Sequence, residues 1–456
     1  MLNRKIESLL YSWIKNDKKA LLIDGARQVG KTFIIRKVLK EHKCEYVEFN
    51  LIQSPELTKL LDKSESVDDM ITSLSLFTNK PFIKGKTFIF IDEIQEFKEI
   101  TTKVKFWVEE GSFRYIFSGS LLGVELKNIT SAPVGYLKTL KMYPMDFEEF
   151  LQIYNFTDAL KDSLYKAFIN RTPVNETVHN RMMQIFNTYL NVGGMPAAVQ
   201  RFSETKNLED VMSEHADIVT QYKKDFTKYE AEEKRIYLTQ IYDLIPAELN
   251  KSNKRFIFAD MKKGLRYEKS AEDFLWLSSA GAALPVYNVT EPAIPLIINE
   301  NSSLFKLFLS DVGMLTTLYG KAAKIQILSN NSDMNFGAVY ENIAAQELKA
   351  HGLTLYYYNS KRFGELDFVI EYKGKVLPIE IKSGKNYKRH SALCNIMEIS
   401  NYSIDEAFVF TNYNVEVKGK YIYYPIYMLM FINDEDMKLP TVDITDLSEL
   451  TYLSVM

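Results

Sequence analysis

The stretch GARQVGKT at residues 25–32 decides how the N-terminal part of the chain folds. Its spacing is that of a phosphate-binding loop, with a glycine, four further residues and then Gly-Lys-Thr. An apolar run at residues 20–24 precedes it, and apolar residues at helical spacing follow it over residues 31–40. The sequence therefore predicts a strand, a glycine-rich loop and a helix, in the order that such a loop requires.

The residues of this loop are suited to holding a polyphosphate. Glycines let backbone N–H groups turn towards phosphate oxygens, and the N-terminus of the following helix adds a positive dipole. Lys31 is expected to contact the β- and γ-phosphates, and Thr32 is expected to contact a magnesium ion. The expected nucleotide-binding residues are Gly25, Arg27, Gln28, Gly30, Lys31 and Thr32.

A second stretch, TFIFIDE at residues 87–93, reads as an apolar strand that ends in two acids. In a parallel sheet this end lies beside the phosphate loop. Asp92 is expected to hold magnesium, directly or through water, and Glu93 to orient or deprotonate the attacking water. Ser118 ends a neighbouring strand-like run and could reach the γ-phosphate or the water, although serines at strand ends are also ordinary turn residues.

The order of apolar runs indicates how the chain is divided. Strand-like runs at residues 46–51 and 114–118 join the two already described, with helical or polar segments between them, which predicts a parallel sheet covered on both faces. At Asp146 the pattern becomes helical, with the capping-box spacing to Glu149. The predicted domains are a core at 1–145, a helical region at 146–229, a small module at 230–300 and a C-terminal domain at 301–456.

Composition restricts the function classes. The net charge of −3 and the pI near 6.1 argue against indiscriminate coating of nucleic acid, so DNA contact would need a local patch such as the basic stretch at 251–269, which a solvated surface also explains. Two cysteines, Cys44 and Cys394, are too few for a disulfide framework or a zinc site. With no signal-peptide pattern and no apolar run long enough to span a bilayer, we expect a cytoplasmic protein.

Four residues stand out in the C-terminal domain. Glu341 lies in a helix-like segment, Asp367 in the strand-like ELDFVIEY, and Glu380 with Lys382 in VLPIEIKSG, after a turn expected at residues 373–375. Residues two apart in a strand share a face, so Glu380 and Lys382 would point to the same side, where Asp367 can meet them. Two carboxylates could hold divalent ions while the lysine acts on an attacking water. A half-exposed strand pair with a surface ion pair explains the same pattern.

With these residues placed, the chain resembles the AAA-type ATPases that carry a C-terminal domain of unknown function called DUF4143. The resemblance spans nearly the whole length and rests on GARQVGKT, FIFIDEIQ, SGS at 118–120, YPMDFEEFL, YLNVGGMP at 189–196, FLSDVGML at 308–315, GELDFVI and LPIEIKSG. It implies an AAA-like core, a helical lid, a winged-helix-like module and, from about residue 331, a domain similar to PD-(D/E)XK restriction endonucleases. The family often has a basic residue shortly after the strand-end serines, where this chain reads PVGY at 133–136, so no arginine finger is assigned.

These observations lead to an α/β multidomain protein with ATP and Mg²⁺ as cofactors and a second Mg²⁺ or Mn²⁺ at the C-terminal site. The expected metal ligands are Thr32, Asp92, Glu341, Asp367 and Glu380, and the expected catalytic residues are Glu93, Ser118 and Lys382. Three functions stay open: an ATPase whose nucleotide state controls a DNA-acting nuclease-like domain, a regulatory ATPase switch with a non-catalytic binding domain, and a chaperone-like protein remodeller. In the winged-helix-like module the acids Glu268, Glu272 and Asp273 disfavour DNA, so a protein partner there is an alternative, and the oligomeric state is left open.

Overall fold

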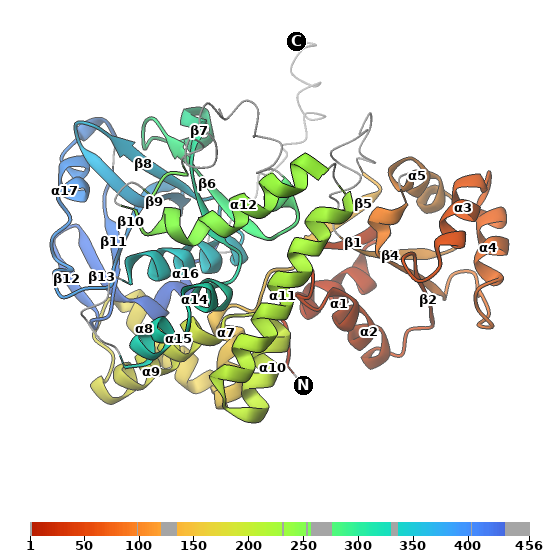
Figure 1. The fold of residues 1–456 in the computed structure, drawn as a ribbon, viewed down its shortest axis with the longest axis horizontal. Helices are drawn as coiled ribbons and strands as arrows, with labels where there is room; N and C mark the ends of the chain where they lie inside the picture. Colours follow the sequence, from red (N-terminus) through yellow and green to blue (C-terminus); the bar gives the residue numbers. More distant parts are fainter. Residues whose placement is uncertain are drawn as a thin grey trace, which may run out of the picture.

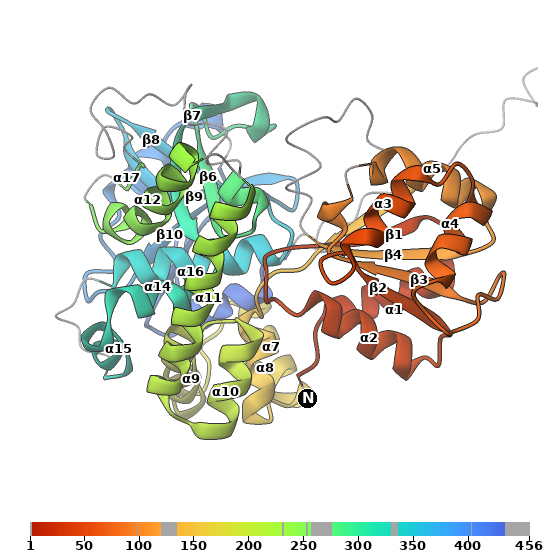
Figure 2. The ribbon, with the colours of Figure 1, turned by 45° about the vertical axis from the view of Figure 1, so that its right-hand side comes forward.

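The computed structural model describes residues 2–97, 99–119, 135–229, 232–251, 254–256, 276–329, 336–402 and 404–433, and the statements below concern these residues (Figure 1). Two lobes are visible in Figure 2, a core lobe that ends near residue 145 and a C-terminal lobe formed by the rest. Ser120, residues 133–134, most of the basic stretch at 251–269, the acids Glu268, Glu272 and Asp273, and residues 434–456 lie outside the described residues.

The core lobe is built on a five-stranded sheet in the order β2-β3-β4-β1-β5, in which every pair is parallel. The strands are β1 (Ala20–Asp24), β2 (Tyr46–Asn50), β3 (Phe88–Asp92), β4 (Arg114–Gly119) and β5 (Leu137–Lys141). The first four agree with the apolar runs in the sequence. β5 was not expected, because this edge strand is mostly exposed and its sequence, LKTLK, has no continuous apolar run.

Helices cover both faces of this sheet, as the parallel arrangement requires. The helices are α1 (Ile6–Asn16), α2 (Lys31–Glu41), α3 (Pro55–Lys63), α4 (Val67–Ser75) and α5 (Ile100–Glu110). Leu21 and Ile23 pack with α1 and α2, whereas Leu22 packs with α3, α4 and α5. Successive side chains along β1 therefore point to opposite faces of the sheet, and each face is packed against its own group of helices.

The helical region begins with the expected capping box, in which the Glu149 amide donates to Asp146 at 2.8 Å and the Asp146 amide donates to Glu149 at 3.2 Å. It comprises α7 (Phe147–Phe150), η2 (Leu151–Tyr154), α8 (Asp158–Asn170), α9 (Glu176–Val192), α10 (Pro196–Thr205), α11 (Leu208–Tyr229) and α12 (Glu232–Leu249). None of the described helices is both long and apolar enough to cross a bilayer.

An eight-stranded mixed sheet forms the centre of the C-terminal lobe, in the order β12-β13-β11-β10-β9-β8-β6-β7. Its strands are β6 (Ala283–Val289), β7 (Glu300–Leu309), β8 (Tyr356–Ser360), β9 (Gly364–Tyr372), β10 (Lys375–Lys382), β11 (Ala407–Thr411), β12 (Glu416–Lys418) and β13 (Tyr421–Pro425). The hairpin turn between β9 and β10 is present, with Lys373 at φ 51° and Gly374 at φ 75°, the left-handed pair that two-residue hairpins favour.

The predicted boundary at residue 300 is wrong. β6, expected in a separate module at 230–300, pairs antiparallel with β7 and parallel with β8, so it belongs to the C-terminal sheet. The sequence does predict a strand in this region. Its partner strands come later in the chain, and no local sequence pattern indicates which strands pair with it. A separate winged-helix-like module is not seen in the described residues of 230–300.

Helix α16 (Gly337–Ala350) lies across the middle of the lobe, with every residue from Ala338 to Leu348 buried (Figure 1). Around it lie α14 (Val312–Tyr319), α15 (Lys321–Leu328), α17 (Ser391–Met397) and the 3-10 turns η4 (Leu296–Asn299), η5 (Ser400–Tyr402) and η6 (Ile426–Phe431). Residues of the helical region and of the C-terminal sheet share one hydrophobic core, which also continues into the α1 and α2 side of the core lobe.

A buried aspartate joins the helical region to α14. The Oδ2 atom of Asp311 accepts from the Gly194 amide at 2.6 Å, and its Oδ1 atom caps α14 by accepting from the Met314 amide at 2.9 Å. Gly194 is required at this contact, because a Cβ atom there would lie 1.9 Å from the carbonyl oxygen of Met145. The motifs YLNVGGMP and FLSDVGML therefore contact each other, through Gly194 of the first and Asp311 of the second.

We expect Asp311→Ala to lower the free energy of unfolding by about 2–4 kcal/mol, because it leaves a buried amide unpaired and removes a helix cap. Urea unfolding followed by circular dichroism measures this loss. Thr157→Ala is the matched control, since Thr157 caps the exposed start of α8 in the same lobe and its loss should cost about 1 kcal/mol. Equal losses for the two variants would contradict the role given to Asp311.

Candidate functional site

The phosphate loop leaves β1 at Asp24 and enters α2 at Lys31, as the sequence predicts. Gly30 caps the helix at φ 94°, in the left-handed region that glycine adopts at little cost. The Lys31 ammonium donates to the carbonyl oxygens of Gly25 at 2.7 Å and Ala26 at 2.8 Å. Burial lowers the pKa of Lys31 to about 8, while the nearby charges of Glu93 and Asp24 oppose this shift. A cation is therefore held inside the loop, where phosphate oxygens could replace the carbonyls.

Asp92 is the centre of a polar cluster at the carboxyl ends of three strands. The Thr32 hydroxyl donates to its two carboxylate oxygens at 3.2 and 3.0 Å, and the Asn50 amide donates to Oδ2 at 3.1 Å. Ser118, the register partner of Asp92 on β4, donates its hydroxyl to Oδ1. Thr32 and Asp92 thus converge as the sequence predicts, whereas the Ser118 hydroxyl is directed at Asp92 in this structure.

Glu93 has hydrogen-bond partners of its own beside this cluster. It follows β3 in the left-handed conformation, at φ 58°, which is uncommon for a residue other than glycine. Its carboxylate accepts a hydrogen bond from the Gln95 side chain, and its amide donates to Asp92 Oδ1 at 3.1 Å. The two acids are therefore adjacent in sequence but are held by different partners.

Helix α11 of the C-terminal lobe reaches the phosphate loop. Arg27 forms an ion pair with Asp225 at 2.8 Å, the Tyr222 hydroxyl donates to the Arg27 carbonyl at 3.1 Å, and Gln28 hydrogen bonds to Gln221. The side chains of Arg27 and Gln28, expected to bind the nucleotide, are directed at this helix. Nothing in the loop motif identifies these partners, which lie almost 200 positions further along the chain.

An apolar pocket of about 420 Å³ adjoins Gly30 on another side of the loop. Val29 and Phe33 come from the loop and α2, Pro196 comes from α10, and Leu2 and Arg4 come from the N-terminal segment. The Arg4 guanidinium ties this segment to the loop by donating to the Val29 carbonyl at 3.0 Å. The pocket has the size and apolar lining that a planar base needs.

The four C-terminal residues also come together. The Lys382 ammonium donates to Glu380 Oε1 at 2.6 Å, and Asp367 Oδ2 accepts from the Ile381 amide at 2.8 Å. Burial, and then the charge of Asp367, raise the pKa of Glu380 to about 8, and the same two causes raise the pKa of Glu341. Burial would lower the pKa of Lys382, but the charges of Glu380 and Asp367 raise it.

Two lysines occupy this site, Lys306, which the sequence did not single out, and Lys254, which the sequence placed in the basic stretch at 251–269. Lys306, on β7 and fully buried, lies 3.6 Å from Glu341 Oε2 and 2.7 Å from Glu365, and Lys254 forms an ion pair with Glu341. The described residues include no group of three His, Cys, Asp or Glu side chains placed to hold a metal ion. The expected ligand set of Glu341, Asp367 and Glu380 is thus not supported as a second metal site.

The phosphate loop fits its implied metal better. A hydroxyl and a carboxylate, both oxygen ligands of the kind that Mg²⁺ prefers, lie about 3 Å apart on Thr32 and Asp92. Asn50 and Gln95, which hold the two acids, were missed in the sequence. Asn50 could have been found, because it lies near the end of the strand-like run at 46–51. The carboxyl ends of parallel strands meet at the same edge of the sheet, which is where Asp92 is expected.

Comparisons with known proteins agree with this geometry. The chain matches the family described as "AAA domain" over residues 17–151, a "Domain of unknown function (DUF8612)" over 183–325 and a "Domain of unknown function (DUF4143)" over 336–429. No curated protein matches the chain.

Solved structures also resemble it, at low identity. The Walker-type ATPase PABY2304 of Pyrococcus abyssi is 16% identical, with a TM-score of 0.42, covering 70% of this chain and 96% of that one. The Orc1 protein of Aeropyrum pernix in complex with DNA is 13% identical, with a TM-score of 0.30 and coverages of 71% and 92%. The RuvB Holliday junction branch migration motor of Thermotoga maritima is 16% identical, with a TM-score of 0.28 and coverages of 62% and 89%.

The phosphate loop, the parallel sheet around it and the matched families together define a P-loop ATPase-like protein. Its N-terminal region matches the AAA domain family and its C-terminal region matches DUF4143, which is the domain combination of the family that the sequence resembles.

The raised pKa of Glu380 gives a pH-dependent stability. Because the folded chain keeps this proton to a higher pH than the unfolded chain does, the contribution of Glu380 to stability falls as the pH rises from about 5 to about 8. Glu380→Gln has no proton to lose, so its free energy of unfolding should rise relative to the parent over this range, by at most about 1.4 kcal/mol per pH unit. Urea unfolding at several pH values measures the difference, and a difference independent of pH would contradict the assignment.

Proposed function

We propose that this chain binds ATP with magnesium at the phosphate loop, hydrolyses it, and uses the nucleotide state to control its C-terminal lobe. The observation that carries the proposal is the placement of Lys31, Thr32 and Asp92 around one loop with Glu93 beside them on a different partner. Phosphoryl transfer to water requires cations that contact the phosphates and a separate carboxylate that acts on the attacking water. This arrangement of residues would supply both.

Each residue has a defined task in this proposal. Lys31 would exchange its loop carbonyls for the β- and γ-phosphates, and the base would enter the apolar pocket beside Gly30. Thr32 and Asp92 would hold magnesium, which supplies positive charge to the phosphate oxygens. Glu93 would orient the attacking water and accept its proton. Ser118 would keep the Asp92 carboxylate in place through its hydrogen bond, and so would act as a positioning residue.

Control of the C-terminal lobe follows from the contacts of α11. Arg27 and Gln28 sit inside the loop motif and bind Asp225 and Gln221, so a nucleotide that rearranges the loop also changes these contacts. On the same helix Tyr222 and neighbouring apolar residues belong to the core of the C-terminal lobe. A change at the loop can therefore reach the lobe through a continuous, packed helix.

We expect Lys31→Ala to abolish tight ATP binding, because the polyphosphate loses the ammonium group that the motif places on the β- and γ-phosphates. Glu93→Gln should keep ATP binding but reduce turnover by about a hundredfold or more, because only the group that acts on water is removed. Calorimetry measures the binding, and phosphate release measures the turnover.

The matched control is Glu45→Gln, which removes an exposed carboxylate from the same lobe and should leave both quantities unchanged. Parental turnover in Glu93→Gln would show that the role assigned to Glu93 is wrong.

For the C-terminal lobe we propose a non-catalytic binding domain, so that the chain acts as an ATP-dependent switch. The ion pairs of Glu341 with two lysines support this proposal, because each lysine already supplies the positive charge that a metal would bring. A metal-dependent nuclease is the second candidate. Its support is the convergence of Asp367, Glu380 and Lys382, the acid, acid and lysine of the sequence pattern.

A metal titration separates the two candidates. In the Lys31→Ala background, which removes the phosphate-loop site from the measurement, we expect no manganese binding that depends on Asp367 or Glu380 and no cutting of single- or double-stranded DNA. Calorimetry with Asp367→Asn and Glu380→Gln, and with the exposed Asp405→Asn as a control, tests this. Manganese binding that Asp367→Asn and Glu380→Gln abolish, together with cutting that Lys382→Ala abolishes, would favour the nuclease.

A further inference from the structure

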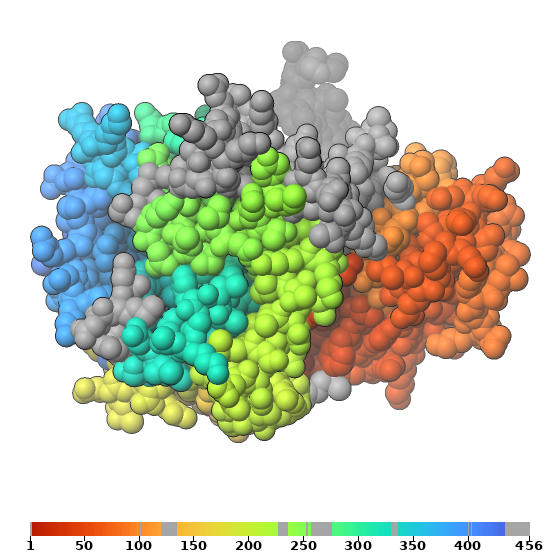
Figure 3. Space-filling model, viewed as in Figure 1, coloured from red at the N-terminus to blue at the C-terminus, as the bar shows by residue number. Residues whose placement is uncertain are grey.

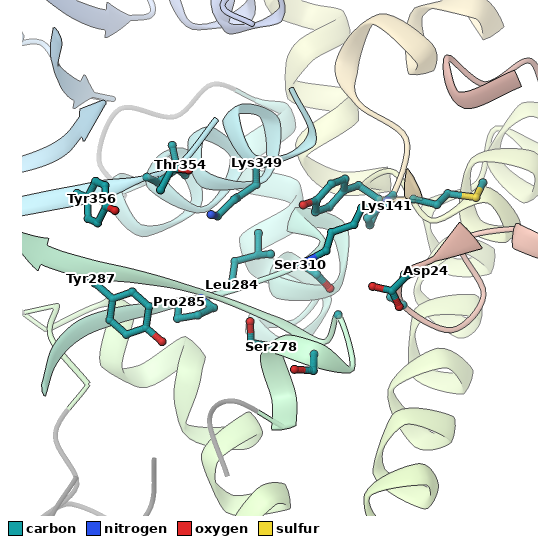
Figure 4. A pocket seen from close by; sticks show the side chains of 18 of the residues that line it. Asp24, Lys141, Ser278, Leu284, Pro285, Tyr287, Ser310, Lys349, Thr354 and Tyr356 are labelled. Atoms are coloured by element: carbon teal, nitrogen blue, oxygen red, sulfur yellow. The ribbon is translucent and has the colours of Figure 1, made fainter. Parts of the chain in front are cut away.

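A second pocket lies between the two lobes, beside the start of the phosphate loop (Figure 4). Its volume is about 380 Å³, within the range of sites for small molecules. The core lobe contributes the end of β1 with the start of the loop, and residues 141–144 after β5. The C-terminal lobe contributes β6, the end of α16 and the start of β8. The pocket therefore exists only where the lobes meet.

Two lysines in this pocket carry positive charge that no described residue neutralises by an ion pair. Lys141 ends β5 on the core side, and Lys349 lies in the last turn of α16 on the other side (Figure 4). Burial lowers the pKa of Lys349, and the charge of Lys141 lowers it further, while Glu300 opposes the shift. Lys141 is exposed and Lys349 is half-buried, so both ammonium groups can meet an anion that enters the pocket, and such an anion would relieve their mutual repulsion.

The two acids in the lining do not remove this positive charge. Burial raises the pKa of Tyr356, and the charge of Glu300, which also acts on Lys349, raises it further. Asp24 is the register partner of Lys141 in the sheet, yet the two form no ion pair, and its charge acts on Lys31 and on Tyr143. These acids could accept hydrogen bonds from hydroxyl or amino groups of a ligand, which a simple inorganic anion lacks.

The remaining lining supports a flat, partly apolar ligand. Tyr143, Tyr287 and Tyr356 provide aromatic surface, and Ser278 and Ser279 provide hydroxyl groups at the mouth of the C-terminal side. Aromatic faces suit the stacking of a planar ring. Lysines suit a phosphate group, and hydrogen-bond acceptors suit the hydroxyl groups of a sugar.

We propose that this interlobe pocket binds a nucleotide-sized phosphorylated ligand, separately from the ATP at the phosphate loop, with the phosphate held by Lys141 and Lys349. A nucleic-acid strand is a different ligand class, and the enclosed volume favours the small molecule over it. The proposal goes beyond the proposed ATPase function, because it concerns a second ligand at other residues.

The site would regulate the phosphate loop. Gly25 and Ala26 belong to the phosphate loop and also line the interlobe pocket. Gly281, from the opposite lobe, lies against Ala26, and a Cβ atom on Gly281 would be 2.8 Å from the Ala26 amide nitrogen. A ligand that bridges the lobes therefore fixes this contact and changes the affinity of the loop for ATP. By linkage, ATP changes the affinity of the pocket by the same factor.

The test uses the full chain with Lys31→Ala, so that binding at the phosphate loop does not enter the measurement. The probes are the four 5′-ribonucleoside monophosphates, their uncharged nucleosides, inorganic phosphate and a short single-stranded DNA, titrated by calorimetry. We expect at least one monophosphate to bind, with its nucleoside and inorganic phosphate bound at least about tenfold more weakly. Lys141→Met and Lys349→Met should each weaken that binding by about tenfold or more, since each removes a charge-assisted hydrogen bond.

The matched control is Lys138→Met, which removes a lysine of the same strand that pairs with Asp17 at 3.3 Å instead of facing the pocket, and should leave binding unchanged. A second readout separates a ligand contact from a structural role. Lys349→Met should keep or raise the melting temperature of the ligand-free chain, because it removes a repelled, partly buried charge.

The proposal is overturned if no monophosphate binds at millimolar concentration, if inorganic phosphate binds as well as every monophosphate, or if the three methionine variants bind alike. Binding of the DNA alone would replace the small molecule with a nucleic acid. None of these outcomes depends on whether the phosphate loop hydrolyses ATP, so the two proposals fail separately.

Discussion

The burial of polar side chains along α16 is the constraint on which the C-terminal lobe depends. Asn342 exchanges two hydrogen bonds with the backbone of Leu309, at 2.8 and 3.0 Å, and Gln346 accepts from the Val312 amide at 2.8 Å. Glu347 accepts from the Phe147 amide at 2.9 Å. A buried amide or carboxylate without a partner costs about 1–3 kcal/mol, so these bonds fix where β7 ends, where α14 begins and where the helical region starts.

This helix also connects the sites of the molecule. Glu341, near its start, lies among the acids and lysines of the C-terminal cluster, and Lys349, in its last turn, lies in the interlobe pocket. Between them, α14 packs against both α16 and α11, and α11 holds Arg27 of the phosphate loop. The space-filling view shows α11 beside the core lobe and α12 over the C-terminal lobe (Figure 3). In the proposed switch, a rearrangement of the phosphate loop would therefore change the packing of α11, α14 and α16 in the C-terminal lobe.

Local patterns in the sequence predicted the core lobe well, because most of its strands are continuous apolar runs and its loop is a short motif. Four of the five parallel strands, the loop, and the pairing of Thr32 with Asp92 follow from apolar runs and from the rule that parallel strands end at one edge. Contacts between distant segments could not be read in this way. The edge strand β5 lacks an apolar run, and β6 pairs with residues that lie 11 to 69 positions further along the chain.

The C-terminal cluster shows the same limit more sharply. Alternation along β10 correctly placed Glu380 and Lys382 together, and their hydrogen bond follows from it. Lys306, on β7, reaches Glu341 only because β7 and α16 pack against each other, and no spacing in the sequence indicates this. A motif of acids thus predicted a metal site, whereas the fold brings lysines to the same acids.

The central claim, that the nucleotide state of the loop is transmitted through α11 to α16, is tested most directly by hydrogen–deuterium exchange. The Glu93→Gln chain, which should retain ATP, would be compared with and without saturating ATP and magnesium. We expect exchange to change in the loop at residues 25–32 and also in α11 and α16. Changes confined to the core lobe, with α11 and α16 exchanging as they do without nucleotide, would contradict the claim.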